Sequence, residues 1–378
     1  MALNAITIIG AGPVGLKAAI ELKKEGWEPK VIEEHPEIGV PENCSGLISA
    51  SGVKETKLDI EDIAVNKVKG AIIKAPNGIE LKIERSKPVA YVIERKKLDK
   101  KFYAEALKKG IEIRTETRLI DLRKDTLFVQ FKQRGEMIKT ELLIGADGVN
   151  SRVRKLMNLS VNPEHFVLTT QVRAKGSFNK DFVELSFGEQ YKGFFAWTIP
   201  ESSTTARIGV GVKPGMNPKI ALQKYMNGMK VEVLSESSSI IPIGKPLKEI
   251  ATEKILLLGD AGFQTKASTG GGIITGMIAA EAAVKTISNY YKKKKPLTEY
   301  SKHLSHLNKE LELHWRIRKY LNSLNDRQLN ELFIKLKKAR IEEFLAEHGD
   351  MDKPSKFIGR ILTTPRLWSL APLALKLR

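Results

Sequence analysis

The chain has 378 residues, more than one hydrophobic core usually supports, so we expect two or three domains. Hydrophobic residues make up 42% and charged residues 28%, which is typical of a globular protein and excludes a disordered one. The net charge of +19 favours anionic partners, but no zinc-ligand spacing or aromatic RNA-binding strand accompanies it, so nucleic acid is not expected as a partner.

Cys44 is the only cysteine, and the chain opens on a strand-like segment with no charged, cleavable leader. Both features predict an intracellular, cytoplasmic protein without disulfides. The longest weakly polar stretch, residues 270–287, is rich in glycine and alanine and is interrupted by Glu281. It therefore predicts a buried helix and not a membrane span.

Residues 4–34 predict a strand, a glycine turn, an amphipathic helix and a second strand. The turn has the spacing Gly10-x-Gly12-x-x-Gly15, in which the first glycine permits a tight turn, the second lets a pyrophosphate approach, and the third lets helix and strand pack closely. Glu33 ends the second strand, where a carboxylate accepts hydrogen bonds from ribose hydroxyls. Strand, turn, helix and acid together predict a dinucleotide site.

Three later segments place further groups at the ends of predicted strands, where ligands bind in open α/β sheets. Arg95 stands just before a predicted helix, a position from which its guanidinium can reach phosphate or ribityl oxygens. An apolar strand runs into residues 145–148, Gly-Ala-Asp-Gly. Another ends at Asp260 and is followed by the turn Gly270-Gly271-Gly272 before a long helix of small residues.

These four segments, in this order, resemble the FAD-containing family that shares the p-hydroxybenzoate hydroxylase fold. The resemblance implies FAD as the cofactor and an α/β (mixed α+β) architecture: a Rossmann-like FAD-binding domain, an antiparallel-sheet substrate domain and a helical C-terminal region. It also implies that Asp260 contacts the ribityl chain of FAD.

The stretch "PENCSGLIS" narrows the resemblance to the archaeal geranylgeranyl reductases. In that family the cysteine and the following glycine lie against the isoalloxazine, which here implies Cys44 and Gly46. "FFAWTIP" resembles the family's Tyr-x-Trp-x-Phe-Pro stretch in the prenyl cavity, with two aromatic positions changed, and implies Phe195, Trp197 and Pro200 as cavity wall. The same matching adds Val14, Leu119, Gly272 and Ile273 to the residues around FAD.

The resemblance implies an FAD-dependent reductase that saturates geranylgeranyl chains of a lipid or diphosphate, in archaeal membrane ether lipids. An aromatic monooxygenase of the same fold is the enzyme alternative, and a prenyl-binding escort without flavin chemistry is the non-enzyme alternative. The electron donor is either a ferredoxin-like carrier or NAD(P)H. The only other Gly-x-Gly, at 209–211, lies within a strand-like run and predicts close backbone packing instead of a nicotinamide turn.

For Cys44 three roles stay open: proton donor for the alkene, redox thiol, or packing. A dithiol relay is excluded because no second cysteine exists. We take Cys44 as the catalytic candidate, with a proton-handling or supporting role. The histidines have no metal-ligand spacing, and His303, His306 and His314, in a lysine-rich helical run, are expected at the surface.

The predicted domains interleave along the chain. The C-terminal sequence mixes leucines and Trp368 with basic residues, so it either docks on the protein itself or makes a peripheral contact with the inner face of the membrane. Leucines at helical spacing from residue 304 onward predict that the tail is helical and packs on the sheet domain. The expected boundaries are 1–66, 89–160 and 243–290 for the FAD-binding domain, 67–88 for a small hairpin inserted in it, 161–242 for the antiparallel sheet domain, and 291–378 for the helical region.

Overall fold

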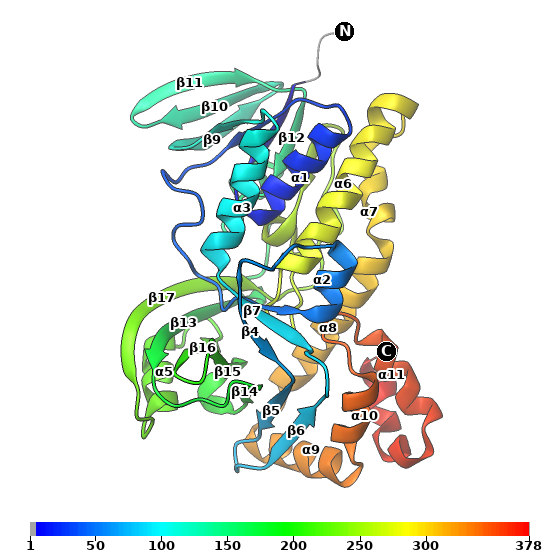
Figure 1. Cartoon of the computed structure of the whole chain (residues 1–378). Coiled ribbons are helices and arrows are strands. Elements are labelled where there is room, and N and C mark those ends of the chain that lie inside the picture. The colour runs from blue at the N-terminus through cyan, green and yellow to red at the C-terminus, as the bar shows by residue number, and fades with distance from the viewer. Residues whose placement is uncertain (1–4, 378) are drawn as a thin grey trace.

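The structure, a computed structural model, describes residues 5–377 (Figure 1). Residues 1–4 and 378, which fall in the first and last predicted segments, lie outside it. Within the described residues, a parallel sheet of five strands has the order β18-β12-β1-β2-β8, so the order reverses at β1. A ligand is expected beyond the carboxyl ends of the strands at such a reversal. The bounds are β1 (Ile6–Ile9), β2 (Pro29–Ile32), β8 (Glu112–Arg114), β12 (Leu142–Gly145) and β18 (Ile255–Leu257).

Helices α1, α3 and α6 run beside one another along this sheet (Figure 1). Pro13 is the first residue of α1, where its fixed φ suits the first helical turn. Lys23 and Lys24 lie in the last turn and stabilise the negative end of the helix dipole. A Cβ added to Gly276 of α6 would come within 2.4 Å of Val14, so the two helices touch through a glycine. The bounds are α1 (Pro13–Lys24), α3 (Arg95–Lys108) and α6 (Ile273–Lys293).

A second sheet, with seven strands among the residues described, has the order β17-β13-β16-β15-β14-β5-β6. Its neighbours are antiparallel except β14 and β5, which are parallel. The strands β5 and β6 come from the predicted hairpin at 67–88, so that segment extends the sheet. The bounds are β5 (Gly70–Lys74), β6 (Glu80–Glu84), β13 (Phe166–Lys175), β14 (Phe182–Ser186), β15 (Gly193–Pro200), β16 (Thr205–Val212) and β17 (Glu232–Pro242), with α5 (Pro218–Met226) packed on one face.

Strand β15 is buried along its whole length, because hydrophobic clusters cover both faces of the sheet. A register shift between Gly193 and Ala196 puts the consecutive rings of Phe194 and Phe195 in one cluster, stacked with centroids 4.0 Å apart. A Cβ on Gly209 of β16 would lie 2.4 Å from the ring of Trp197. The prediction that residues 209–211 mark close packing is therefore confirmed.

Between residues 5 and 160 the structure also contains two three-stranded sheets and two short helices. One sheet has the order β3-β7-β4 and joins the two large sheets, and the other has the order β11-β10-β9. The bounds are β3 (Leu47–Ser49), α2 (Ala50–Thr56), β4 (Ala64–Val68), β7 (Ala90–Ile93), β9 (Thr117–Arg123), β10 (Thr126–Phe131), β11 (Arg134–Lys139) and α4 (Arg152–Leu156).

The described chain from residue 297 to residue 377 is mainly helical and packs on the end of the seven-stranded sheet, as predicted (Figure 1). Leu81 of β6 shares a hydrophobic cluster with Phe333, Phe344 and Ile358 of the tail. In the part of the chain described, no helix has the length and apolarity needed to cross a bilayer. The bounds are α7 (Tyr300–His303), α8 (Ser305–Ser323), α9 (Asp326–Lys338), α10 (Ile341–His348), α11 (Ser355–Thr363) and α12 (Ala371–Leu377), and the 3-10 turns are η1 (Pro163–His165), η2 (Glu189–Tyr191), η3 (Gly259–Gly262), η4 (Leu297–Glu299) and η5 (Pro365–Leu370).

Candidate active site

A cavity of about 750 Å³ lies where the carboxyl ends of the parallel strands, the seven-stranded sheet and the C-terminal helices meet. It brings together residues that are far apart in the sequence and that were predicted separately for the cofactor and the substrate. One continuous space therefore joins the predicted FAD cradle to the predicted prenyl wall. The predicted residues that line it are Gly12, Val14, Cys44, Arg95, Asp260, Gly270, Gly271, Gly272, Ile273, Phe195 and Trp197.

Gly12 gives a direct test of whether a cofactor fits. A Cβ added there would meet no protein atom within 4 Å, although Gly12 lines the cavity and precedes α1. The protein itself has no need of a glycine at this position, whereas a pyrophosphate lying against the backbone does. Gly12 and Gly272 are the N-cap residues of α1 and α6, and neither helix has a side-chain hydrogen bond at its N-cap. Backbone N–H groups at both helix starts can therefore bind an anion.

Gly10 and Gly15 act differently, because they shape the turn from within and do not line the cavity. Gly10 has φ +103°, and a Cβ there would lie 2.3 Å from the carbonyl oxygen of Ala146. A Cβ on Gly15 would lie 2.1 Å from the carbonyl oxygen of Gly10. Both glycines let backbone approach backbone, as their spacing predicts.

Glu33 fixes the same turn to the end of β2. Its Oε2 accepts a hydrogen bond from the N–H of Ala11 at 2.8 Å, and its Oε1 accepts one from the N–H of His35 at 2.9 Å. The carboxylate keeps lone pairs for the ribose hydroxyls that the sequence predicts as its ligands. The side chain stands at the rim and is not part of the cavity lining.

Arg95 points its guanidinium into the cavity and is held there by a buried carboxylate. It donates to Asp99 one turn later through Nε at 3.1 Å and through Nη2 at 2.9 and 3.0 Å. Burial opposes the charged form, but Asp99 and Cys44 outweigh it and raise the pKa of Arg95. A fixed, permanently charged fork at this place suits phosphate or ribityl oxygens.

Asp260 follows β18 and faces the glycine turn that opens α6. Its carboxylate accepts a hydrogen bond from the hydroxyl of Thr265 at 2.6 Å, and a Cβ on Gly272 would come within 2.8 Å of it. Burial raises the pKa of Asp260. A buried carboxyl group with a single side-chain hydrogen bond has spare acceptor capacity, which a hydroxylated chain such as ribityl satisfies.

Cys44 lines the cavity at the edge of the substrate sheet. Its Sγ accepts a hydrogen bond from the N–H of Gly46 at 3.3 Å. Its carbonyl oxygen accepts from Nε2 of Gln171 and from Nη1 of Arg207, both at 3.1 Å. The backbone of Cys44 is therefore pinned from two strands of the sheet, which fixes where the thiol lies.

The other predicted residues lie outside the lining. Gly46 has φ +69° and packs so closely that a Cβ would be 2.3 Å from the carbonyl oxygen of Ile93. Leu119 is buried in β9 within the core of the parallel sheet. Pro200 ends β15, where its carbonyl oxygen accepts a hydrogen bond from Asn66 at 2.8 Å. Their predicted contacts with FAD or substrate stay predictions.

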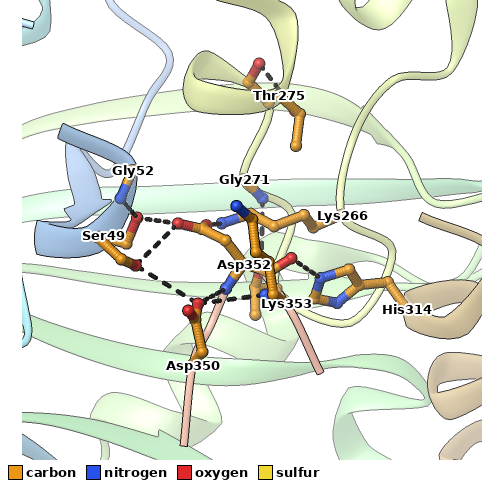
Figure 2. A network of polar contacts seen from close by, with 12 residues as sticks. Ser49, Gly52, Lys266, Gly271, Thr275, His314, Asp350, Asp352 and Lys353 are labelled. Atoms are coloured by element: carbon orange, nitrogen blue, oxygen red, sulfur yellow. Dashed lines mark hydrogen bonds and ion pairs between the residues drawn. The ribbon is translucent and has the colours of Figure 1, made fainter. Parts of the chain in front are cut away.

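A buried polar network in the cavity wall was not predicted (Figure 2). Asp352 accepts a hydrogen bond from Ser49 and forms an ion pair with Lys266, and both Ser49 and Asp352 are almost fully buried. The segments that meet here lie before α2, before α6, and between α10 and α11. No sequence spacing links residues this far apart, so only the tertiary structure reveals them.

The expectation that His314 lies at the surface is wrong, since it is 2% exposed. Its Nε2 donates to the carbonyl oxygen of Asp352 at 3.2 Å, so Nδ1 accepts from the hydroxyl of Ser268 at 2.5 Å. Burial, together with the charge of Lys266, lowers the pKa of His314 to about 4 and keeps the ring neutral. Helical spacing could have revealed that His314 is buried, because it falls three residues after Leu311, on the leucine face of α8.

Comparison with known proteins agrees with this geometry. The family model for the FAD binding domain matches residues 4–207. A digeranylgeranylglycerophospholipid reductase of Methanocaldococcus jannaschii is 29% identical over 381 aligned positions, covering 95% of this chain and 94% of that protein. The chain belongs to the geranylgeranyl reductase family of FAD-binding proteins. It is an FAD-dependent oxidoreductase.

Two solved structures share the fold of this reductase family member. A geranylgeranyl bacteriochlorophyll reductase-like protein from Thermoplasma acidophilum superposes with a TM-score of 0.85 at 21% identity, covering 98% of each chain. The p-nitrophenol 4-monooxygenase of Pseudomonas putida superposes with a TM-score of 0.67 at 16% identity, covering 99% of this chain and 98% of that one. The fold thus serves reductases and monooxygenases alike, and the site has to decide between them.

We expect Gly12→Ala to weaken FAD binding more than tenfold, because the added methyl group enters space that only the cofactor uses. The apoprotein should unfold at the same temperature as wild-type apoprotein, since no protein atom lies within 4 Å of the new Cβ. FAD fluorescence titration and thermal unfolding measure the two effects. Equal loss of apoprotein stability and FAD affinity would contradict a cradle at Gly12.

Proposed function

We propose that this protein saturates carbon–carbon double bonds of geranylgeranyl chains, as part of building archaeal membrane ether lipids, with FAD held by Gly12, Val14, Arg95, Asp260 and residues 270–273. The observation that carries the proposal is the continuity of the cavity, which runs from the FAD cradle into an apolar chamber. The relatives named as digeranylgeranylglycerophospholipid reductases support the same substrate class.

The apolar chamber suits a long hydrocarbon chain. Each CH₂ group that leaves water for such a wall contributes about 0.8 kcal/mol, so a polyprenyl chain gains binding energy along its whole length. The lining also carries polar side chains, such as Gln171 and Ser238, but its apolar side chains come from three parts of the fold and cover more surface than one aromatic ring contacts. The apolar side chains that line the chamber are Val183, Leu185, Phe194, Phe195, Trp197, Ile199, Ile317, Met351 and Phe357.

Reduction of an isolated alkene needs a hydride on one carbon and a proton on the other. Reduced FAD supplies the hydride. The protein's part is to keep water out, to align the double bond and to deliver the proton. Trp197 helps because its ring lies in the wall and tolerates positive charge at the more substituted carbon, with a benefit of about 1 to 2 kcal/mol when desolvated.

Cys44 is the residue we propose for the proton. It lines the cavity beside the cradle, and its backbone is pinned by Gln171 and Arg207. A thiol held in one place can protonate a carbon above it and be reprotonated from solvent afterwards.

For the electron donor, we favour a ferredoxin-like carrier over NAD(P)H. Gly209 and Gly211, the candidates for a second nucleotide turn, face the rings of Trp197 and Phe194, and their strand β16 is paired with β13 on one side and β15 on the other, so it does not form a phosphate-binding turn. The net charge of +19 also suits an acidic carrier protein.

The function is tested anaerobically. The purified protein is reduced with dithionite and mixed with a geranylgeranyl lipid, and flavin absorbance and lipid mass are followed together. We expect flavin reoxidation and a mass gain of two hydrogens for each bond saturated. A flavin that stays reduced until oxygen enters, with the lipid unchanged, would move the aromatic monooxygenase to first place.

We expect Cys44→Ser to slow reoxidation of the reduced flavin by the lipid about a hundredfold, because a hydroxyl is a far weaker acid than a thiol. Reoxidation by a redox dye needs no proton on carbon and should keep its wild-type rate, and the FAD spectrum should be unchanged. A wild-type rate with lipid would remove Cys44 from the chemistry.

We further propose that the protein works in the cytoplasm with its C-terminal segment against the membrane. Trp368 and Leu375 are each 61% exposed, although neighbouring residues of the same segment are buried. Arg366 and Lys376 are exposed and close to them in the sequence; Arg366 pairs with Glu343 and Lys376 lies over the ring of Tyr320, and both can also attract anionic head groups. Phe357 of α11 lines the cavity, so this segment connects the exposed apolar side chains to the chamber.

The double variant Trp368→Ser, Leu375→Ser should bind vesicles containing anionic lipid several-fold more weakly than wild type in a sedimentation assay. Met137→Ser is the matched control, since Met137 is 72% exposed on β11, far along the chain from the tail. Equal binding by the double variant and the control would exclude the tail as the membrane contact.

A further inference from the structure

The loop between η3 and α6 carries buried charges that the proposed function does not use. Lys266 lies in this loop, 4% exposed, and Arg318 of α8 is bound to it, 2% exposed. Because burying a charge is costly, each buried cation needs a compensating anion or a strong functional reason. The loop ends in residues 270–272, which line the FAD cavity.

Lys266 lies against the glycine turn itself. A Cβ placed on Gly271 would be 2.8 Å from Cε and 3.1 Å from Nζ of Lys266, and the N–H of Lys266 donates to the carbonyl oxygen of Gly271 at 3.0 Å. Lys266 lines the cavity, and its ammonium is paired with Asp352 (Figure 2). The positive end of this ion pair is therefore beside the backbone that faces the cofactor.

Arg318 has no such partner. Its guanidinium donates to the carbonyl oxygens of Ala267 at 3.0 Å, Ser268 at 2.7 Å and Phe194 at 3.2 Å. Within residues 5–377 it makes no ion pair with a carboxylate. Burial lowers the pKa of Arg318 to about 9, so the group still carries its charge near neutral pH.

The charges around the loop do not cancel. Lys266 and Asp352 balance each other, and the neighbouring Asp350 is paired with Lys356 at 2.8 Å. His314 is neutral, and both of its ring nitrogens form hydrogen bonds, one with Ser268 and one with Asp352. Asp260 also faces the turn, and burial raises its pKa and so opposes its charged form. Arg318 adds a positive charge beside the turn that no carboxylate within residues 5–377 pairs with.

We propose that Lys266 and Arg318 give the Gly270–Gly272 turn a positive field that stabilises FAD in its anionic reduced state, and that Asp352 limits this field. Oxidised FAD takes up two electrons and one proton and so gains one negative charge, which a nearby cation favours. Lys266 and Asp352 are thus positioning residues that set the reduction potential. This inference rests on the FAD site and not on the lipid substrate.

A purely structural role for the network makes a different prediction. If the Lys266–Asp352 pair only tied the C-terminal segment to the loop, loss of either partner would loosen the same contact and move every property in the same direction. An electrostatic role instead requires that removal of the cation and removal of the anion shift the potential in opposite directions.

The test compares the flavin midpoint potentials of Lys266→Met and Asp352→Asn with wild type, by dithionite titration against a reference dye. The Lys266→Met protein is compared with wild type at about pH 8, where an unpaired carboxyl is ionised while Arg318 keeps its charge, and the Asp352→Asn protein is compared with wild type at about pH 6, where an unpaired buried amine stays protonated. We expect a lower potential for Lys266→Met and a higher one for Asp352→Asn, each about tenfold in the ratio of reduced to oxidised flavin.

Two controls accompany the test. Lys353 follows Asp352 in the sequence and forms an exposed ion pair with Glu55 at 2.6 Å. Lys353→Met removes this pair and should leave the flavin midpoint potential unchanged. Lys266→Arg keeps the charge and should stay near the wild-type potential, and Lys266→Gln replaces Lys266→Met if that variant does not fold. Shifts of Lys266→Met and Asp352→Asn in the same direction, or no shift in these two variants while they retain FAD, would overturn the proposal. No lipid is present, so a failure here is distinct from a failure of the reductase function.

Discussion

The site depends on places where backbone touches backbone because a side chain is missing. Gly10 and Gly15 let β1 and α1 meet each other and the backbone at Ala146, just after β12, and Gly276 lets α6 meet α1 at Val14. Any larger residue at these positions would push the two helix starts apart. Since the N–H groups of α1 and α6 converge on one cavity only at this spacing, the cofactor cradle follows from close packing more than from any single polar contact.

This dependence explains which parts of the site the sequence could predict. Gly10, Gly12 and Gly15 act within one strand-turn-helix unit, so their spacing along the chain already contains the geometry. Residues 209–211 could be interpreted correctly for the same reason, because glycines within a strand-like run indicate packing. The alternating and helical patterns likewise gave the antiparallel sheet and the helical tail, whereas the domain boundaries stay predictions.

The contacts that could not be predicted join residues that are far apart in the sequence. Asp352 meets Ser49 across 303 positions and Lys266 across 86, so no local pattern records the contact. His314 was assigned to the surface because its neighbours are lysine-rich, although it lies on the buried face of its helix. Local composition describes the average of a segment, while burial is decided by the face each residue presents.

The charge beside the cofactor also constrains the chemistry of the chamber. Arg318 lies over the rings of Phe194 and Phe195, with centroid distances of 4.5 and 5.4 Å, so those rings already interact with a cation. A free carbocation next to them would meet an unfavourable field, whereas among residues 5–377 no cation lies over the ring of Trp197. Stabilising reduced FAD makes electron uptake easier and hydride release harder. The proton delivery that we propose for Cys44, in step with hydride transfer, would meet the first constraint, since no full positive charge then develops on the lipid chain.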